Sequence, residues 1–349
     1  MASRPIAASH SYITRPISIY VDEVVKPNIS MPTVLRDSKE LIQIVESLRI
    51  TPGSLLVTAD VKSLYPNINT QKAIVALDLL LREKSVPETP LLIQLTRIVF
   101  ENNFLISEFS QDIFHQTFGI AMGTPFAVTA ANAFMFYHEI DIVKRYSPHL
   151  QLYKRFIDDI FVIWSGPRDT LLEFLNALNT KDERIKITFD ISDSSIPFLD
   201  LLLSIDTGSN TIQFSTFQKP LNKYLYIPYE SFHPTSNKRA FIIGELMRYA
   251  RNSSSFAAFS NTRELFWKRL RLRGYPYHFL LPLFREVKYC NHSKWLKNKK
   301  RSLNDKIVVF KTTYNSSHLN IKGVIQKYLP EIKCIISYKS TYTLANLCK

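Results

Sequence analysis

Two adjacent aspartates, Asp158 and Asp159, interrupt an otherwise apolar and aromatic stretch, KRFIDDIFVIW, at residues 154–164. Burying an isolated carboxylate is costly, and two like charges side by side cost more unless a positive charge lies between them. The stretch is therefore compatible with two arrangements. Either the aspartates form a polar turn between two strands, or they bind metal ions.

A third carboxylate favours the metal site. Asp60 ends the apolar segment SLLVTADV, which follows the turn signal Pro52-Gly53 and predicts a buried strand. If the two strands are neighbours in one sheet, the three carboxylates converge at one edge. Hard divalent cations prefer such oxygen ligands and bridge to substrate phosphates. Two ions of this kind lower the pKa of an attacking hydroxyl and neutralise the leaving oxygen in a phosphoryl transfer.

A glycine motif lies between the two acidic segments, in FGIAMGTPFAVTAANAFM at residues 118–135. Gly119 and Gly123, followed by Thr124-Pro125, open an apolar segment that predicts a long helix. Glycine here lets a backbone come close to a template or a base pair, and proline near a helix start is pre-organised. The motif is unspecific by itself and becomes informative through its position between the acidic segments.

The order of the predicted elements indicates an α+β fold, a sheet carrying helices, and the segments from about residue 235 onward are expected to be helical. Ser38 is expected to cap a helix within residues 35–50, where apolar residues recur at helical spacing. Further expected helices cover residues 70–84, 124–146, 170–180, 238–252 and 262–274, and expected strands cover 101–119, 150–164, 185–192, 196–206 and 212–220.

The positive charge of the chain is concentrated in one segment. The formal net charge is +14, and residues 219–301 hold 18 Lys and Arg against 4 Glu and no Asp. The acidic and basic residues in the rest of the chain are therefore equal in number. The same segment is rich in Tyr, Phe and Trp. Basic residues interleaved with rings suit a nucleic-acid backbone with stacked bases, although a solvated basic face has the same charge pattern.

Composition excludes several other classes of protein. No apolar run is long enough to span a bilayer, and the N-terminus lacks a secretory signal. The three cysteines, Cys290, Cys334 and Cys348, are odd in number and far apart, which indicates a reducing compartment without a disulfide framework. Cys290 and His292 have no second pair at zinc-finger spacing, so no structural zinc site is expected.

Together, the three motifs resemble the palm of a reverse transcriptase. They are ADVKSLYPNI at 59–68, GIAMGTP at 119–125 with Ala-Asn at 131–132, and RFIDDIFVIW at 155–164. Within that superfamily the chain is most similar to Penelope-like retroelements, through IPFLDLLLS at 196–204, the stretch 217–251 and RGYP at 273–276. The resemblance implies an α+β fold: a right-hand polymerase palm, with an antiparallel sheet backed by helices, followed by a mainly helical, basic thumb or helix-turn-helix-like region.

The resemblance also implies a division of the chain. Residues 1–50 correspond to a remnant of the fingers and a connecting helix, and 51–218 to the palm. Residues 219–285 correspond to the basic thumb or helix-turn-helix-like region, and 286–349 to a C-terminal connection region. The upstream fingers strands, with their triphosphate-binding lysine, and a GIY-YIG nuclease are not recognisable in this sequence, so we expect a central piece of a longer product or a truncated copy.

Roles at the palm carry over residue by residue. The resemblance implies that Asp60 and Asp158 hold two Mg²⁺ ions, or Mn²⁺. It also implies that Asp159 completes the Asp158-Asp159 pair and that the Val61 carbonyl adds a backbone ligand. Tyr65 falls where reverse transcriptases place an aromatic gate against a ribose 2′-OH. The remaining expected nucleotide contacts are Arg4 in an Arg-Pro-Ile motif, paired with the incoming triphosphate, and Met122 and Gly123 in the glycine motif.

The basic region then has an expected task, which is to grip the primer–template duplex through its phosphates without reading base sequence. The candidate residues are Arg248, Arg251, Lys268, Arg269, Arg271 and Arg273. The implied partners are an RNA template, a DNA primer and dNTPs, with no membrane; the sequence leaves the oligomeric state open.

Three functional hypotheses follow. The first is an RNA-directed DNA polymerase using two metal ions, and the second is a catalytically inactive remnant that binds nucleic acid through its basic helices. The third is an RNA-dependent RNA polymerase, against which Tyr65 argues. The resemblance also implies nuclear localisation, since such elements act on chromosomes; the one candidate import signal is KNKKR at 297–301.

Overall fold

The computed structural model describes residues 12–106, 112–296, 307–313 and 333–339, with a few positions between the last two ranges. The chain divides into two compact units, Met1–Phe217 and Gln218–Lys349. The helices are α1 Arg15–Asn28, α2 Ser38–Ser47, α3 Leu64–Asn67, α4 Thr70–Glu83, α5 Thr89–Glu101, α6 Ala127–Arg145, α7 Arg168–Thr180, α8 Thr235–Arg251, α9 Phe256–Leu272, α10 Tyr277–Glu286 and α11 His292–Leu296. The strands are β1 Leu55–Val61, β2 Phe104–Ile106, β3 Ile113–His115, β4 Leu150–Phe156, β5 Asp159–Trp164, β6 Ile187–Ser192, β7 Ser195–Phe198, β8 Leu201–Asp206, β9 Thr211–Thr216, β10 Ile307–Thr313 and β11 Lys333–Lys339.

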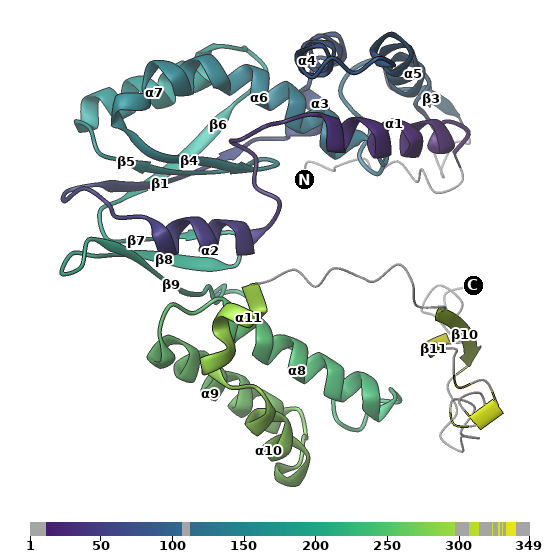
Figure 1. Cartoon of the computed structure of the whole chain (residues 1–349), viewed down its shortest axis with the longest axis vertical. Helices are drawn as coiled ribbons and strands as arrows, with labels where there is room; N and C mark the ends of the chain where they lie inside the picture. Colours follow the sequence, from purple (N-terminus) through teal and green to yellow (C-terminus); the bar gives the residue numbers. More distant parts are fainter. Residues whose placement is uncertain are drawn as a thin grey trace. The chain divides into compact units, whose positions relative to one another are not determined.

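A four-stranded antiparallel sheet in the order β4-β5-β1-β6 forms the centre of the first unit. Helices α6 and α7 cover one face, and α2 with the sheet β7-β8-β9 covers the other (Figure 1). Alternation along β1 explains the layers: Val57, Ala59 and Val61 belong to the apolar core on the helical side. Leu56 is fully buried outside that core. Successive side chains of a strand point to opposite faces, so β1 serves two packed layers.

Most of the predicted elements are present. The segment 150–164 forms two strands that reverse at the aspartates, and 101–119 contains the short pair β2 and β3. The predicted cap of α2 is wrong by one residue: Asp37, not Ser38, accepts a hydrogen bond from the Glu40 backbone N–H at 3.0 Å. The carboxylate of Asp37 therefore satisfies one of the unpaired donors of the first turn.

In the second unit, helices α8, α9, α10 and α11 surround an aromatic core. Tyr249 and Phe266 meet edge to face at 5.3 Å between ring centroids, and Phe266 stacks on Phe284 at 5.8 Å. Strands β10 and β11 pair in parallel further along the chain, so the prediction of helical segments from about residue 235 onward is wrong at 307–313 and 333–339, where runs of Ile and Val favour strands. No helix in the described part of the chain is long and apolar enough to cross a membrane.

Candidate functional site

The aspartates predicted from sequence meet at one end of the central sheet. Asp60 and Asp159 are directly opposite each other in the antiparallel register of β1 and β5. The Val61 backbone N–H donates to the carbonyl of Asp158 at 3.0 Å, which fixes the second aspartate beside the same strand end. Asp60 is exposed, and Asp158 and Asp159 are half-buried, so their carboxylates are accessible from solvent.

The turn that carries Asp158 and Asp159 has an unusual backbone. Ile157, between β4 and β5, has φ +57°. This left-handed conformation is unfavourable for a β-branched residue, since its Cβ crowds the following carbonyl. The turn is held on two sides. The Asp158 carbonyl accepts from Val61, and the Ile157 carbonyl accepts from Arg155 Nη1 at 2.9 Å.

Two hollows lie beside this turn within the first unit. One, of about 220 Å³, is lined by Asp60 and Asp159 together with residues of β6 and the β7 end. Asp190 of β6 also lines it, a fourth carboxylate that the sequence motifs do not indicate. The other, of about 80 Å³, is lined by Tyr65, Met122 and Asp158, among others.

Tyr65 and Met122, both predicted to contact a nucleotide, are thus brought to Asp158. Tyr65 lies on the short helix α3 and is half-buried. Burial, and secondarily the negative charge of Asp158, raise the pKa of the Tyr65 hydroxyl, which keeps it neutral. Among the other predicted residues, Gly123 is exposed with φ +104°, and Arg4 lies outside the described residues. A second Arg-Pro-Ile, at residues 15–17, opens α1.

Gly119 makes a close backbone contact within the chain. A Cβ at this position would stand 2.7 Å from the Pro66 carbonyl oxygen and 2.8 Å from that of Tyr65. Its φ is +77°, which also favours glycine. Next to it, the Ile120 N–H donates to the Tyr65 carbonyl at 2.8 Å. The glycine loop therefore packs on the backbone that carries Tyr65.

The donor set at the strand end fits divalent cations. It consists of the carboxylate oxygens of Asp60 and Asp159 on adjacent strands and of Asp158 in the turn; the only sulfur atom among the residues that line the two hollows is the thioether of Met122, a soft ligand that such ions do not favour. Hard ions such as Mg²⁺ prefer oxygen, and Mn²⁺ accepts the same ligands. Val61 has a fully buried side chain, so this residue can offer only backbone atoms.

The six basic residues predicted to contact phosphates all have partners inside the second unit. Arg248 pairs with Glu245, Lys268 pairs with Glu264, and Arg251 donates to Asn252. The other three lie at the end of α9: Arg269 and Arg273 contact the segment before α8, and Arg271 contacts the α9–α10 turn. Arg269 donates to Gln218 at 2.6 Å, Arg271 to the Tyr275 carbonyl at 2.6 Å and Arg273 to the Tyr226 carbonyl at 2.7 Å.

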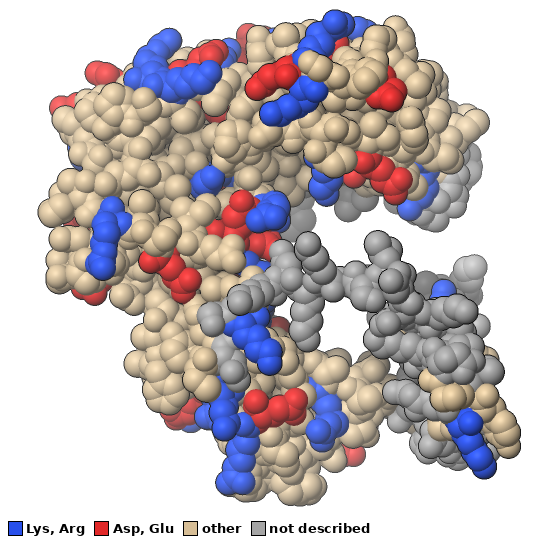
Figure 2. All heavy atoms as spheres, in the orientation of Figure 1, with Lys and Arg blue, Asp and Glu red and all other residues tan. Residues whose placement is uncertain are grey.

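Other cations of this unit were not singled out from the sequence. On the face drawn in Figure 2, Lys and Arg side chains lie over the helices of the second unit with a few acidic ones between them. The exposed cations include Lys219, Lys223, Arg239, Arg285 and Lys288. Sequence alone gives no signal to separate these solvent-facing cations from the arginines that hold the unit together, since both kinds lie in the same basic stretch.

Comparisons with known proteins concern the fold and the basic helical region. Residues 225–285 match the family model of the animal helix-turn-helix domain. The structure of Candida albicans telomerase in complex with a fragment of telomeric RNA aligns with a TM-score of 0.50 and 12% identity, covering 75% of this chain and 45% of that one. No curated protein matches the sequence.

Two further structures align at lower scores. Apo telomerase from Candida tropicalis has a TM-score of 0.47 and 13% identity, over 82% of this chain and 52% of that one. The RNA-dependent RNA polymerase of a human picobirnavirus has a TM-score of 0.46 and 12% identity, over 81% and 56%. The chain spans about half the length of the telomerase chains that it matches.

The fold is therefore that of a nucleic-acid polymerase, with an antiparallel palm sheet backed by helices and a helical region after it. The predicted fold class is confirmed, and the helix-turn-helix match falls within the predicted basic helical region.

Proposed function

We propose that this chain is an RNA-directed DNA polymerase of a Penelope-like retroelement, which adds dNTPs to the 3′-hydroxyl of a DNA primer on an RNA template. The observation that carries the proposal is the register of β1 and β5, in which Asp60 and Asp159 are opposite and Asp158 is tied to Val61. The motif resemblance adds the retroelement class, and we propose nuclear localisation on that ground alone.

In this mechanism Asp60 and Asp158 would hold two Mg²⁺ ions, and Asp159 would be the second carboxylate of the Asp158-Asp159 pair. When bound, the ions supply activation of the attacking hydroxyl and charge neutralisation of the leaving pyrophosphate. Tyr65 lines the same hollow as Asp158, and in this proposal its ring lies next to the sugar of the incoming nucleotide and excludes a ribose 2′-OH. The exposed cations of the second unit bind phosphates of the duplex and supply affinity without sequence preference.

A second candidate function is nucleic-acid binding without catalysis. The observation that favours it is the helix-turn-helix match at residues 225–285, inside the segment that holds the whole net charge. In this case the palm would be a folded remnant whose aspartates no longer support turnover.

Primer extension separates the candidates. The purified chain is incubated with an RNA template annealed to a labelled DNA primer, Mg²⁺ and dNTPs, beside Asp158→Asn as the matched control. We expect Mg²⁺-dependent extension that Asp158→Asn abolishes. Duplex binding without extension would establish the second candidate, and equal use of rNTPs and dNTPs would indicate an RNA polymerase. Extension that survives Asp158→Asn would contradict the metal assignment.

A further inference from the structure

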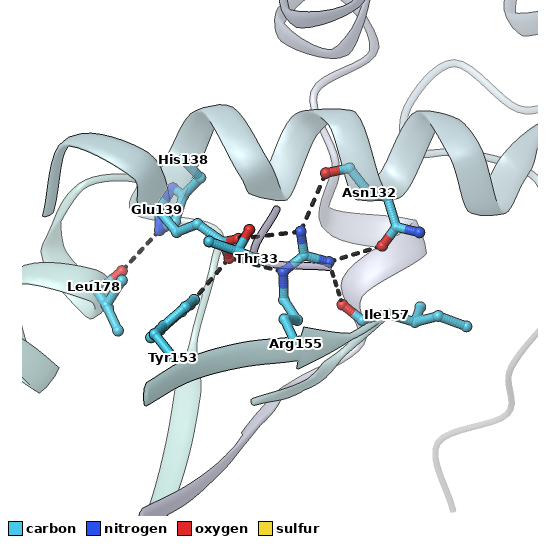
Figure 3. Close-up of polar contacts among 8 residues, drawn as sticks. All are labelled: Thr33, Asn132, His138, Glu139, Tyr153, Arg155, Ile157 and Leu178. Atoms are coloured by element: carbon cyan, nitrogen blue, oxygen red, sulfur yellow. Dashed lines mark hydrogen bonds and ion pairs between the residues drawn. The ribbon is translucent and has the colours of Figure 1, made fainter. Parts of the chain in front are cut away.

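A fully buried ion pair lies directly behind the aspartate turn. Arg155 on β4 and Glu139 on α6 are both 0% exposed, with 2.7 Å between Nε and Oε2 (Figure 3). Glu139 also accepts from the Tyr153 hydroxyl at 3.0 Å and from the Thr33 hydroxyl at 2.6 Å. Every oxygen of this carboxylate is therefore engaged, as a buried charge requires.

The guanidinium of Arg155 has a second set of contacts on the side facing the turn. Nη1 donates to Asn132 Oδ1 at 2.8 Å and to the Ile157 carbonyl at 2.9 Å, and Nη2 donates to the Asn132 carbonyl at 3.2 Å. Figure 3 shows the fork between α6 and the turn, with Glu139 on one side and Ile157 on the other. One side chain thus connects the Ala-Asn motif of α6 to the residue that precedes Asp158.

The residue that this fork holds is the strained one. Ile157 has φ +57°, and such backbone outliers persist only where the surroundings fix them. Across the turn, the Asp158 carbonyl is fixed by the Val61 N–H at 3.0 Å. Two consecutive carbonyls are therefore clamped, one to β1 beside Asp60 and one to α6 through Arg155.

Stability alone is a poor explanation for this arrangement. A buried ion pair is often no more stabilising than apolar residues of the same volume, because both charges lose their hydration. An apolar pair would fill the space between α6 and β4 but would have no donor for the Ile157 carbonyl. The planar guanidinium, with five N–H donors in a fixed geometry, serves both Glu139 and the turn.

We propose that Arg155 is a positioning residue for the metal site. Held in place by Glu139, it fixes the left-handed Ile157 so that Asp158 and Asp159 are presented to the cations in a single arrangement with Asp60. This inference rests on the proposed function for its biological meaning, but its test depends only on metal binding. Loss of supporting contacts behind metal ligands typically weakens binding by roughly ten- to a hundredfold.

The test compares two variants of the full chain that disturb the same buried network on opposite sides. Arg155→Lys keeps a positive charge for Glu139 but loses the fork to Asn132 and Ile157. Tyr153→Phe removes one hydrogen bond to Glu139 and leaves the turn contacts intact. Mn²⁺ binding is measured by electron paramagnetic resonance, thermal unfolding is followed by circular dichroism, and primer extension is titrated with Mg²⁺.

We expect Arg155→Lys to raise the Mn²⁺ dissociation constant about tenfold, with a matching rise in the Mg²⁺ concentration needed for half-maximal extension. We expect Tyr153→Phe to lower the unfolding temperature and to leave the Mn²⁺ constant unchanged. The inference would be overturned if Arg155→Lys bound Mn²⁺ as tightly as the unchanged protein. It would also be overturned if Arg155→Lys and Tyr153→Phe lost Mn²⁺ affinity to the same extent.

A second variant keeps the inference testable if Arg155→Lys does not fold. Asn132→Ala removes the Oδ1 acceptor of Arg155 Nη1 and should raise the Mn²⁺ dissociation constant several-fold; an unchanged constant would overturn the inference. Mn²⁺ binding without primer extension would contradict the polymerase proposal alone. Absence of Mn²⁺ binding by the unchanged protein would overturn the positioning role itself.

Discussion

The Pro66 carbonyl lies so close to Gly119 that a Cβ at residue 119 would stand 2.7 Å from its oxygen. The glycine motif and the segment that carries Tyr65 are therefore fitted to each other through their backbones. A side chain at residue 119 would overlap main-chain atoms of Tyr65 and Pro66, so either the glycine loop or the segment that carries Tyr65 would have to shift.

Gly119→Ala is expected to destabilise the first unit. The left-handed φ alone costs about 1–2 kcal/mol for alanine, and the forced overlap adds about 1–3 kcal/mol. Gly53→Ala is the matched control, since Gly53 has φ +80° but no atom within 4 Å of a Cβ. Urea unfolding should show a clearly larger loss for Gly119→Ala; equal losses would mean that the loop shifts freely.

Glu139→Gln should be strongly destabilising, because it leaves the buried Arg155 without a counter-charge. Breaking a buried pair by removing one partner costs about 3–5 kcal/mol. Asp141→Asn on the same helix is the control: Asp141 is largely exposed, lies 3.5 Å from Lys181, and should contribute less than about 1 kcal/mol. The free energy of unfolding measures both, and a small effect of Glu139→Gln would show that water reaches the site.

Tyr65→Ala should weaken discrimination against ribonucleotides, since the ring beside Asp158 is what would meet a 2′-hydroxyl. Tyr65→Phe keeps the ring and should keep the discrimination. The ratio of kcat/KM for dNTP over rNTP is expected to fall by roughly tenfold or more in the alanine variant, as with other pockets that exclude by shape. A ratio that is the same in all three proteins would remove Tyr65 from the gate.

His138 should make folding sensitive to acid. Burial lowers the pKa of its imidazole, the charge of Lys181 lowers it further, and the hydrogen bond to the Leu178 carbonyl at 2.9 Å and the charges of Glu139 and Asp182 oppose the shift without cancelling it. The unfolded chain therefore binds this proton first, and stability is lost as pH falls below about 6.5. The free energy of unfolding, measured at several pH values, should fall less steeply with decreasing pH for His138→Gln, because glutamine does not bind a proton in this range. An unchanged slope would mean that His138 is accessible when folded.

In the second unit, Arg273 is expected to stabilise the fold and the exposed Lys268 is expected to bind nucleic acid. Arg273→Ala loses the bond to the Tyr226 carbonyl and should cost about 1.5–3 kcal/mol, as charged hydrogen bonds do. Lys268→Ala removes only an exposed pair with Glu264 and should stay within about 0.5 kcal/mol. Binding of a nucleic-acid duplex should depend on the other residue: Lys268→Ala should weaken it more than Arg273→Ala does. Titrations at several salt concentrations should show that the slope of the logarithm of the binding constant against the logarithm of the salt concentration falls by about 1 for Lys268→Ala. A stable Arg273→Ala would return that residue to the phosphate-binding set.

The elements were predictable where local pattern decides. The pair of strands in 150–164, the helix within 124–146 and the turn at Gly53 follow from periodicity and backbone preference. Helices α1 and α5 were not predicted. Helix α5, TPLLIQLTRIVFE, buries Leu92, Thr96 and Val99 at helical spacing, but its high apolar content and its β-branched residues favour a strand and weaken that signal.

The sequence by itself determined the chemistry of the candidate site: carboxylates at the ends of apolar strands, a nearby tyrosine and a separate basic segment. Only the tertiary structure decided that Asp60 is opposite Asp159, that Gly119 packs on Pro66 and that Arg155 is buried against Glu139. The physical reason is that strand register and charge burial depend on partners far apart in the chain. Local spacing predicts which groups are present but not which of them the folded core brings together.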